Sequence, residues 1–132
     1  MKPQAVVLYI QNQFGNVLTI TRKDNHNSFG LVGGKVDSTD NTPRDALNRE
    51  VFEETKVDIS AWKEIDTFTA LDGDCLVQAF ILPTEASQLF PQLKTEIFEG
   101  TDSAFVDFKN HRFILDPQHS IFADYNNLLC NH

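Results

Sequence analysis

The sequence predicts an α/β domain spanning residues 1–132, in which a mixed β-sheet lies between helices. Its 132 residues with 41% hydrophobic content are enough for one compact core and hardly enough for two. Strand-like apolar stretches occur both before and after the best-marked helix of the chain, and strands on both sides of a helix imply α/β layers. Neither an internal repeat nor a linker-like stretch divides the sequence, so we expect a single domain.

The first element that the sequence predicts is a hairpin. Residues 4–10 and 16–23 are apolar, strand-like runs, and the segment QNQFG between them has the Asn, Gln and Gly of a turn. A short apolar run, FGLVGG at 29–34, follows and leads into a polar loop.

The strongest helix is expected from about Pro43 to Lys56, and its start is clearly marked. Thr42 can cap the first turn, and Pro43 suits the first helical position, where no backbone donor is needed. Asp45 stands where the acid of a capping box reaches back to the cap. Two strands are then expected within 62–83 about an Asp-Gly turn, another strand at 103–108 and a closing helix at 116–129.

Charge and cysteine content argue against several classes of protein. The net charge of −8 opposes binding to a nucleic-acid polymer, because Lys and Arg contacts to phosphate supply most of that affinity. A small anion would need a local cationic site, made by basic side chains or by a metal ion that acidic groups recruit. Two distant cysteines indicate reduced thiols. The apolar run near the N-terminus is too short for a signal sequence and no later stretch approaches a membrane span, so we expect a soluble, cytoplasmic protein.

Three glutamates gather on the predicted helix. Counted at about 100° per residue from Leu47, Val51 lies about 40° to one side and Glu54 about 20° to the other, so Glu54 is expected within the apolar stripe. Glu50 and Glu53 point into the same neighbourhood. Partly buried carboxylates repel one another unless a cation intervenes. Clustered carboxylate oxygens without nearby His or Cys favour a hard ion, Mg²⁺ or Mn²⁺, over zinc.

A bare Glu-x-x-Glu-Glu pattern is also typical of an ordinary solvated helix face, and only its surroundings favour the metal interpretation. The chain resembles the Nudix hydrolase family, whose signature is Gly, five residues, Glu, seven residues, then Arg-Glu-apolar-x-Glu-Glu-x-Gly-apolar. The residues that match it are Gly34, Arg49, Glu50, Val51, Glu53, Glu54 and Val57. Similarity extends over 7–23 and 98–108 and is greatest to the small MutT-like nucleotide pyrophosphohydrolases.

The sequence departs from this signature at two places. Lys56 stands where the family has glycine, and it loses the easy left-handed exit from the helix that glycine allows. The loop before the helix has one extra residue, so that either Asp40 or Asn41 takes the place of the first glutamate. In the family that glutamate helps to hold the loop to the helix, and we expect some slack there.

The resemblance implies a Nudix fold and a metal-dependent active site on the helix. By the resemblance, Glu50, Glu53 and Glu54 ligate Mg²⁺, with Mn²⁺ as the alternative ion, and Glu53 takes the proton of the attacking water. Arg49, next to Glu50, orients the carboxylates. Glu99, in a loop beyond the helix, approaches the metal from the opposite side and completes its shell or positions water.

Phosphate binding requires cations or backbone donors close to the same helix. Arg22 and Lys23 end the second predicted strand, and Lys35 follows the glycines 33 and 34, whose backbone can approach an anion closely. Each basic residue is also typical of a solvated surface charge, and Gly33 and Gly34 are also typical of a turn. Phe29 is the candidate for stacking on a nucleobase, although most aromatic residues belong to the core.

The function expected is hydrolysis of a nucleoside diphosphate linked to another group, foremost a nucleoside triphosphate cut to monophosphate and pyrophosphate. An ADP-ribose or dinucleoside polyphosphate hydrolase is the alternative among enzymes. A catalytically weak nucleotide-binding sensor on the same fold and an acidic protein-interaction module are alternatives from other classes. The expected partner is a small nucleotide, with no nucleic-acid polymer and no membrane; oligomeric state is left open.

Overall fold

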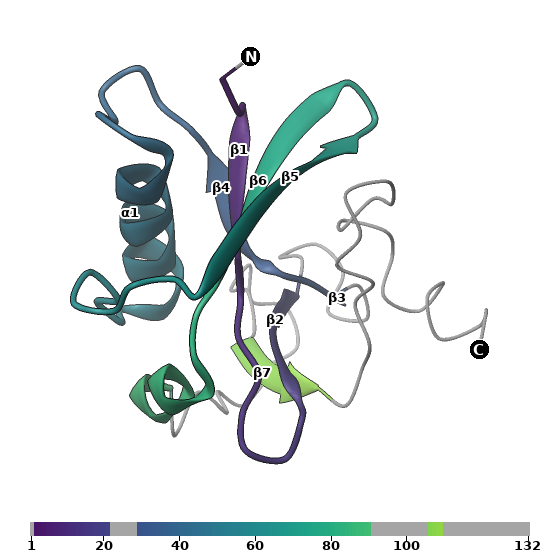
Figure 1. The fold of residues 1–132 in the computed structure, drawn as a ribbon, viewed down its shortest axis with the longest axis vertical. Coiled ribbons are helices and arrows are strands. Elements are labelled where there is room, and N and C mark those ends of the chain that lie inside the picture. Colours follow the sequence, from purple (N-terminus) through teal and green to yellow (C-terminus); the bar gives the residue numbers. More distant parts are fainter. Residues whose placement is uncertain (1, 22–28, 91–105, 110–132) are drawn as a thin grey trace, which may run out of the picture.

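The computed structural model describes residues 2–21, 29–90 and 106–109. Within these residues the chain forms two β-sheets, one α-helix and a 3₁₀-helix (Figure 1). In chain order the elements are β1 (Ala5–Tyr9), β2 (Val17–Thr21), β3 (Phe29–Gly30), β4 (Val32–Lys35), α1 (Pro43–Thr55), β5 (Asp66–Asp72), β6 (Cys75–Ile81), η1 (Thr84–Leu89) and β7 (Val106–Lys109).

The larger sheet is mixed, as the sequence predicts. Its strand order is β4-β1-β6-β5, with β1 parallel to β6 and the other pairs antiparallel. The smaller sheet has the order β3-β2-β7 and is antiparallel. Helix α1 lies against β4 and β1 of the larger sheet (Figure 1). The predicted closing helix at 116–129 lies outside the described residues.

The predicted opening hairpin is confirmed next to its turn, where Gln11 and Val17 form an antiparallel bridge, but β1 and β2 do not pair along their length. The Asn12 N–H donates to the Asn16 carbonyl at 2.9 Å, and Leu18 N–H donates to the Ile10 carbonyl at 3.1 Å. Strands β1 and β2 nevertheless belong to different sheets. Strand β1 pairs with β4 on one edge and with β6 on the other, so β2 can approach the chain only after β1 has ended.

The second predicted hairpin is confirmed. Strands β5 and β6 pair in antiparallel register from Asp66–Ile81 to Asp72–Cys75, and two residues connect them. Gly73, the first of these, has a φ of 60°, which glycine adopts without steric cost. Strand β7 confirms the strand expected at 103–108 where its residues are described.

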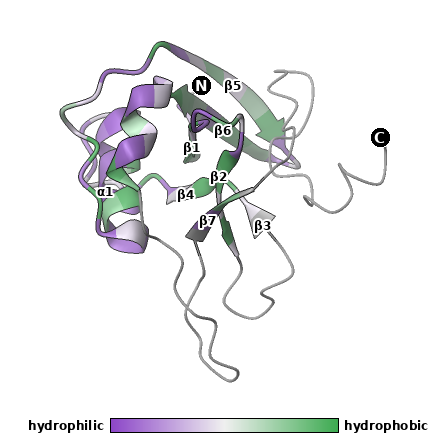
Figure 2. Cartoon of the chain, turned by 90° about the horizontal axis from the view of Figure 1, so that it is seen from below, coloured by the Kyte–Doolittle hydropathy of each residue, from purple (hydrophilic) through white to green (hydrophobic). Residues whose placement is uncertain are grey.

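The core lies on both faces of the larger sheet. All five residues of β1 are buried, and they alternate between two hydrophobic clusters, as the two-residue period of a strand requires. Val6 and Leu8 pack in the cluster that includes Leu47 and Val51 of α1. In Figure 2, β2 and β6 are mostly hydrophobic, whereas α1 is largely hydrophilic and contributes a narrow apolar face. Among the described residues, no helix is long and apolar enough to cross a membrane.

The boundaries of α1 follow the capping residues that the sequence places there. Thr42 is the N-cap, its side-chain oxygen accepts from the Asp45 N–H at 3.1 Å, and Pro43 opens the first turn. The helix ends at Thr55, and the cap residue Lys56 adopts a left-handed conformation with a φ of 63°. A lysine therefore occupies the backbone conformation for which the family signature has glycine.

Candidate active site

The two glycines of β4 leave room for different neighbours. A Cβ atom at Gly33 would lie 2.8 Å from the Cα of Val7, so this glycine lets β4 pack against the backbone of β1. A Cβ atom at Gly34 would lie 2.8 Å from Oε1 of Glu50 and closer still to the carboxyl carbon. The carboxylate that approaches Gly34 is therefore the protein's own, and with a side chain at this position the end of Glu50 would have to move away from β4.

Arg49 connects the loop, the helix and β4. Its Nε and Nη2 atoms donate to the two carboxylate oxygens of Asp40 at 3.1 and 2.9 Å, the bidentate geometry that suits a guanidinium. Its Nη1 atom lies 3.0 Å from Oε1 of Glu50 and 3.4 Å from Oε1 of Glu53. Nη2 also donates to the backbone carbonyl of Lys35 at 3.1 Å. One side chain thus holds together all three elements of the signature.

Of the two loop residues that could take the place of the missing glutamate, Asp40 is the one that contacts the helix. Its side chain is 7% exposed and pairs with Arg49, whereas Asn41 is exposed. The Asp40 carboxylate also accepts from the N–H of Asp37 at 2.8 Å, which closes the loop on itself. The slack expected between loop and helix is therefore absent, because a shorter acid reaches the same guanidinium when the loop is one residue longer.

Asp40 and Glu50, two of the acids that Arg49 contacts, have pKa values shifted in opposite directions. The hydrogen bond from Arg49 holds the pKa of the Asp40 carboxyl below its usual range, with help from the Asp37 N–H. Burial raises the pKa of Glu50, although Arg49 opposes that rise. The pKa of Arg49 is itself raised, chiefly by its hydrogen bond to Asp40. Glu50 is consequently the carboxylate whose charged form gains most from an added cation.

The placement of Glu54 in the apolar stripe is wrong. Glu54 is exposed, and the buried residues of α1 are Ala46, Leu47, Val51 and Thr55. A helical wheel gives the direction of a side chain but not whether other elements cover that direction at its level along the axis. In the last turn, Thr55 is the residue that packs in the core instead of Glu54. The hydroxyl of Thr55 donates to the Val51 carbonyl at 2.6 Å. The side chain of Glu53 is also largely exposed, at 56%.

The acids of α1 fit a divalent ion by their chemistry, although they do not converge on one point. Within the described part of the chain, no three His, Cys, Asp or Glu side chains form a group that could hold a metal ion. Arg49 supplies the positive charge between Glu50 and Glu53. The half-buried Glu50 in the space above Gly34 and the exposed Glu53 nevertheless offer only oxygen donors, as Mg²⁺ or Mn²⁺ prefers.

Several predicted site residues lie outside the described residues. These are Arg22, Lys23 and Glu99; Phe29 is described only as the backbone that begins β3. Lys35 is exposed at the end of β4. Sequence reasoning missed Asp37, whose carboxylate lies 3.4 Å from Nη2 of Arg49. The acid spacing Asp37-x-x-Asp40 in the loop that follows the glycine pair was the available signal.

Three features together define a hydrolase of the Nudix class: strand β4 with its two glycines, the capped helix α1, and the cluster of Arg49 with Glu50 and Glu53. A family model, the NUDIX domain, matches residues 1–121. The chain belongs to the NUDIX domain family, which confirms the resemblance in its sequence. Members of this family generally use divalent metal ions. No curated protein sequence matches the chain.

Solved structures with the same fold show low sequence identity. The Escherichia coli dihydroneopterin triphosphate pyrophosphohydrolase is 18% identical with a TM-score of 0.52, over 83% of this chain and 82% of the other. A putative Nudix hydrolase from Chromobacterium violaceum is 15% identical with a TM-score of 0.56, over 99% and 77%. The NUDIX domain of Shewanella oneidensis NrtR, complexed with ADP ribose, is 16% identical with a TM-score of 0.50, over 83% and 73%. At these identities the likeness establishes the fold alone.

Proposed function

We propose that this Nudix hydrolase splits the diphosphate bridge of a small nucleotide in a Mg²⁺-dependent reaction, foremost a nucleoside triphosphate to monophosphate and pyrophosphate. The observation that carries the proposal is the cluster in which Gly34 admits Glu50 and Arg49 ties Glu50 to Asp40. Such a cluster presents a fixed carboxylate on a rigid sheet edge. A catalytic metal site needs that preorganisation.

The proposed reaction attacks phosphorus with water. The water oxygen forms a bond to one phosphorus, the bridging P–O bond breaks, and a carboxylate takes the proton that the water loses. Bound Mg²⁺, held by Glu50, Glu53, Glu54 and Glu99, would neutralise charge on the phosphate oxygens. Mn²⁺ is the alternative ion.

Exposure favours Glu53 over Glu50 as the base. The Glu53 side chain is 56% exposed, so water can reach it, whereas that of Glu50 is 15% exposed and its Oε1 accepts from Arg49 at 3.0 Å. Arg49 contacts both carboxylates, and we assign it the role of orienting them.

The remaining groups of the proposed site bind the substrate. Lys35 follows Gly34 at the end of β4 and is exposed, and it stays a predicted phosphate ligand. Arg22 and Lys23 stay predicted phosphate ligands, Gly33 and Gly34 predicted backbone contacts of the anion, and Phe29 a predicted stacking residue.

The names of two structural neighbours indicate which substrates to compare. One is a dihydroneopterin triphosphate pyrophosphohydrolase, and another contains ADP ribose. We therefore place nucleoside triphosphates first and ADP-ribose or dinucleoside polyphosphates second. A catalytically weak sensor is the proposal of another class; we rank it lower because Asp40 restores the contact between loop and helix. We propose a cytoplasmic location.

A substrate panel tests this proposal. Nucleoside triphosphates, modified nucleotides, ADP-ribose and dinucleoside polyphosphates are incubated with Mg²⁺ or Mn²⁺, and products are identified by chromatography. We expect Glu53→Gln to lower turnover by roughly a hundred- to ten-thousandfold, the range for losing a general base. The control, Asp74→Asn, removes an exposed acid from the turn between β5 and β6 and should keep full turnover. Nucleotide binding without turnover in the wild type would favour the sensor.

The variant Glu99→Gln, in the loop beyond the helix, is measured in the same turnover assay. We expect it to lower the maximal rate by roughly ten- to a thousandfold with less effect on affinity. Glu96→Gln is its matched control. If only Glu96→Gln impairs turnover, the assignment of the loop acid is wrong.

A further inference from the structure

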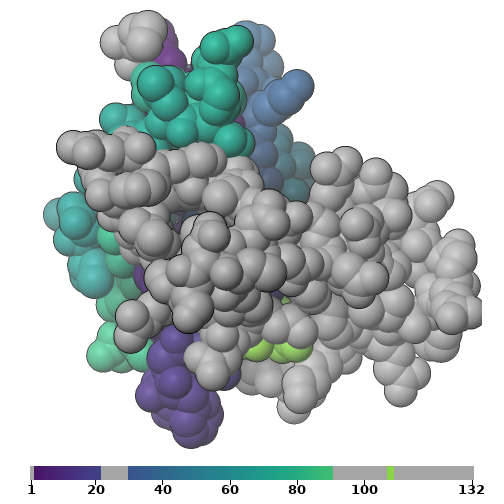
Figure 3. Space-filling view, turned by 90° about the vertical axis from the view of Figure 1, so that its right-hand side faces the viewer, coloured from purple at the N-terminus to yellow at the C-terminus, as the bar shows by residue number. Residues whose placement is uncertain are grey.

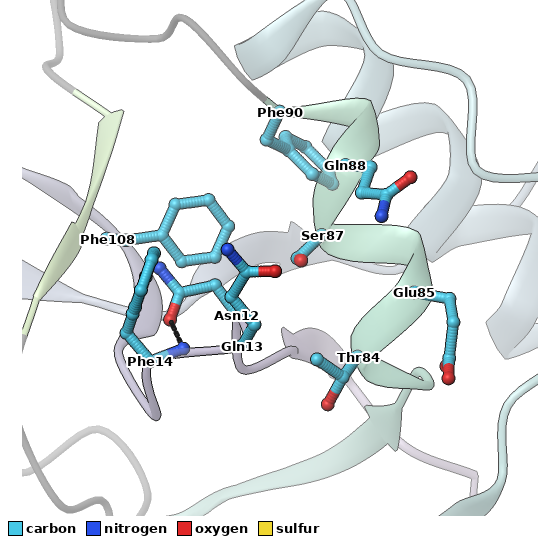
Figure 4. Close-up of a pocket in the computed structure, with 9 residues that line it drawn as sticks. All are labelled: Asn12, Gln13, Phe14, Thr84, Glu85, Ser87, Gln88, Phe90 and Phe108. Carbon is cyan, nitrogen blue, oxygen red and sulfur yellow. Dashed lines mark hydrogen bonds between the residues drawn. The ribbon is translucent and has the colours of Figure 1, made fainter.

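A cavity of about 580 Å³ lies away from the candidate active site. It is bounded by the turn between β1 and β2, by η1 and by β7 (Figure 4). Figure 1 places this turn at the opposite end of the molecule from the loop that precedes α1, and Figure 3 shows the turn projecting from the lower end. None of the residues that line the cavity is among the acids, glycines or basic residues assigned above. Its volume lies within the range of small-molecule sites.

Three phenylalanine rings face this cavity. Phe90 is buried and meets Phe108 edge to face, with ring centroids 6.5 Å apart and planes at 78°. Their packing fixes both rings, because Phe90 belongs to the main hydrophobic core. Phe14 stands at the rim and is 77% exposed. In Figure 4 the rings of Phe14 and Phe108 lie on the same side of the cavity, opposite the side chains of η1.

The exposed ring of Phe14 sits on a rigid turn. The side-chain oxygen of Asn12 accepts from the Phe14 N–H at 3.0 Å and from the Asn16 N–H at 2.9 Å. Gly15 donates to the Asn12 carbonyl at 3.0 Å and has a φ of 80°, which favours glycine. These bonds hold an aromatic face in water at the mouth of a cavity, ready to stack without ordering the backbone first.

The polar lining matches the edge of a heterocyclic base. Among the residues that the structure describes, the side chains of Gln13 and Ser87 line the cavity without a hydrogen bond to another described residue. Carboxamides present a donor and an acceptor side by side, which is the pattern that pairs with nucleobase edges. Figure 4 shows Ser87 projecting from η1 toward Phe108, whereas the carboxamide of Gln88 lies on the other side of η1.

Charge determines which part of a ligand can enter. Glu85 is the one ionisable side chain among the described residues around the cavity, and it is negative. The whole chain carries a net charge of −8. Toward the described lining, a phosphate group would therefore meet repulsion from Glu85, whereas an uncharged nucleoside would not.

We propose that this cavity binds the planar base of an uncharged nucleoside, stacked on Phe14 and hydrogen-bonded to Gln13 and Ser87. This second site goes beyond the hydrolysis proposed above and requires no metal. Base–aromatic stacking tolerates different bases, so Gln13 and Ser87 supply the discrimination between them.

Nucleoside binding in metal-free buffer tests the proposal. Adenosine, guanosine, cytidine and uridine are compared by saturation-transfer NMR and calorimetry on the full chain. We expect Phe14→Ala to weaken binding about tenfold or more, the effect of losing one stacking face. Phe14→Trp should keep affinity, and the fluorescence of the new tryptophan should be quenched on binding. The matched control is Phe52→Ala, which removes another exposed ring, on α1 and outside the cavity.

A comparison of charged and uncharged ligands distinguishes binding in this cavity from binding at the candidate active site. The 5′-triphosphate of the best nucleoside should bind the cavity more weakly than the nucleoside itself, and Glu85→Gln should narrow that difference. No nucleoside binding at millimolar concentration, or equal binding by the wild type and Phe14→Ala, overturns the proposal. Because no turnover is measured, either result is independent of whether the chain hydrolyses nucleotides.

Discussion

Arg44 and Arg49 lie five positions apart on α1 and show how one residue type serves two purposes. Arg44 donates to the carbonyls of Ile59 and Trp62 at 2.9 and 2.6 Å and pairs with Glu64 at 2.8 Å. It connects α1 to the segment that follows the helix. Its side chain is 18% exposed, against 27% for Arg49.

Arg49 faces mainly acids, although the backbone carbonyl of Lys35 also accepts from it. Its guanidinium is within 3.4 Å of the carboxylates of Asp37, Asp40, Glu50 and Glu53. Replacing Arg44 would leave neutral carbonyls without a donor, a cost in stability, whereas replacing Arg49 would leave like charges facing one another at the proposed site. The same side chain should therefore affect stability at one position and turnover at the other.

The largest effect expected is on turnover, from Arg49→Ala. Loss of the guanidinium group that orients Glu50 and Glu53 should lower kcat about a hundredfold, the usual result of misplacing catalytic groups. Arg49→Lys should recover little, because an ammonium cannot make the bidentate contact to Asp40. Steady-state kinetics with Mg²⁺ measure both variants. Unchanged kcat in Arg49→Ala would remove the distinction between the two arginines.

Arg44→Ala should have the complementary effect. We expect the free energy of unfolding to fall by about 2 kcal/mol, because the carbonyls of Ile59 and Trp62 lose their donor. Urea denaturation measures this loss, and kcat below the unfolding transition should stay within a few-fold of the wild type. A large fall in kcat with unchanged stability would contradict the comparison.

Asp40→Asn should act on stability through pH. The folded chain keeps Asp40 ionised where the unfolded chain has already bound a proton, so the stability it contributes is present above the ordinary aspartate pKa of about 3.9. It is lost as pH falls through the lowered folded value. The variant should therefore have a lower Tm than the wild type at neutral pH, with the gap closing in acid.

Asn41→Ala is the matched control for that measurement. Asn41 is the exposed neighbour that the sequence left as an alternative, and its replacement should shift Tm equally at every pH. Glu50 acts in the opposite sense, because its raised pKa gives stability that is lost as pH rises. A gap that widens in acid would show that Asp40 is not the residue held by Arg49.

The smallest effect expected comes from Lys56→Gly. Glycine removes the steric cost of a φ of 63°, and we expect a gain of about 1 kcal/mol in the free energy of unfolding. Lys56→Ala, which keeps a Cβ atom, should give no such gain. The ranking of substrates should stay the same in both variants. A changed ranking would mean that the end of α1 contacts the substrate.

Local features of this protein follow from its sequence. The start of α1 at Thr42 and Pro43 and the two-residue turn at Gly73 were predicted correctly, because each depends on the conformations open to a few neighbouring residues. The register of Gly34 with the acids of α1 was also readable, since the family signature records that spacing. Residues 22–28 and 91–105, with Arg22, Lys23 and Glu99, lie outside the described residues and stay predictions.

Tertiary structure alone decided three other features. Strand β2 joined a separate sheet because β4 and β6 already occupy both edges of β1. Asp40 was chosen over Asn41 because its carboxylate reaches Arg49, a side chain nine residues away on another element. Glu54 is exposed, and Thr55 is the buried residue in the last turn of α1. Propensity and spacing act between neighbours in the chain, whereas pairing and burial depend on which distant elements fill the space, and no local pattern carries that information.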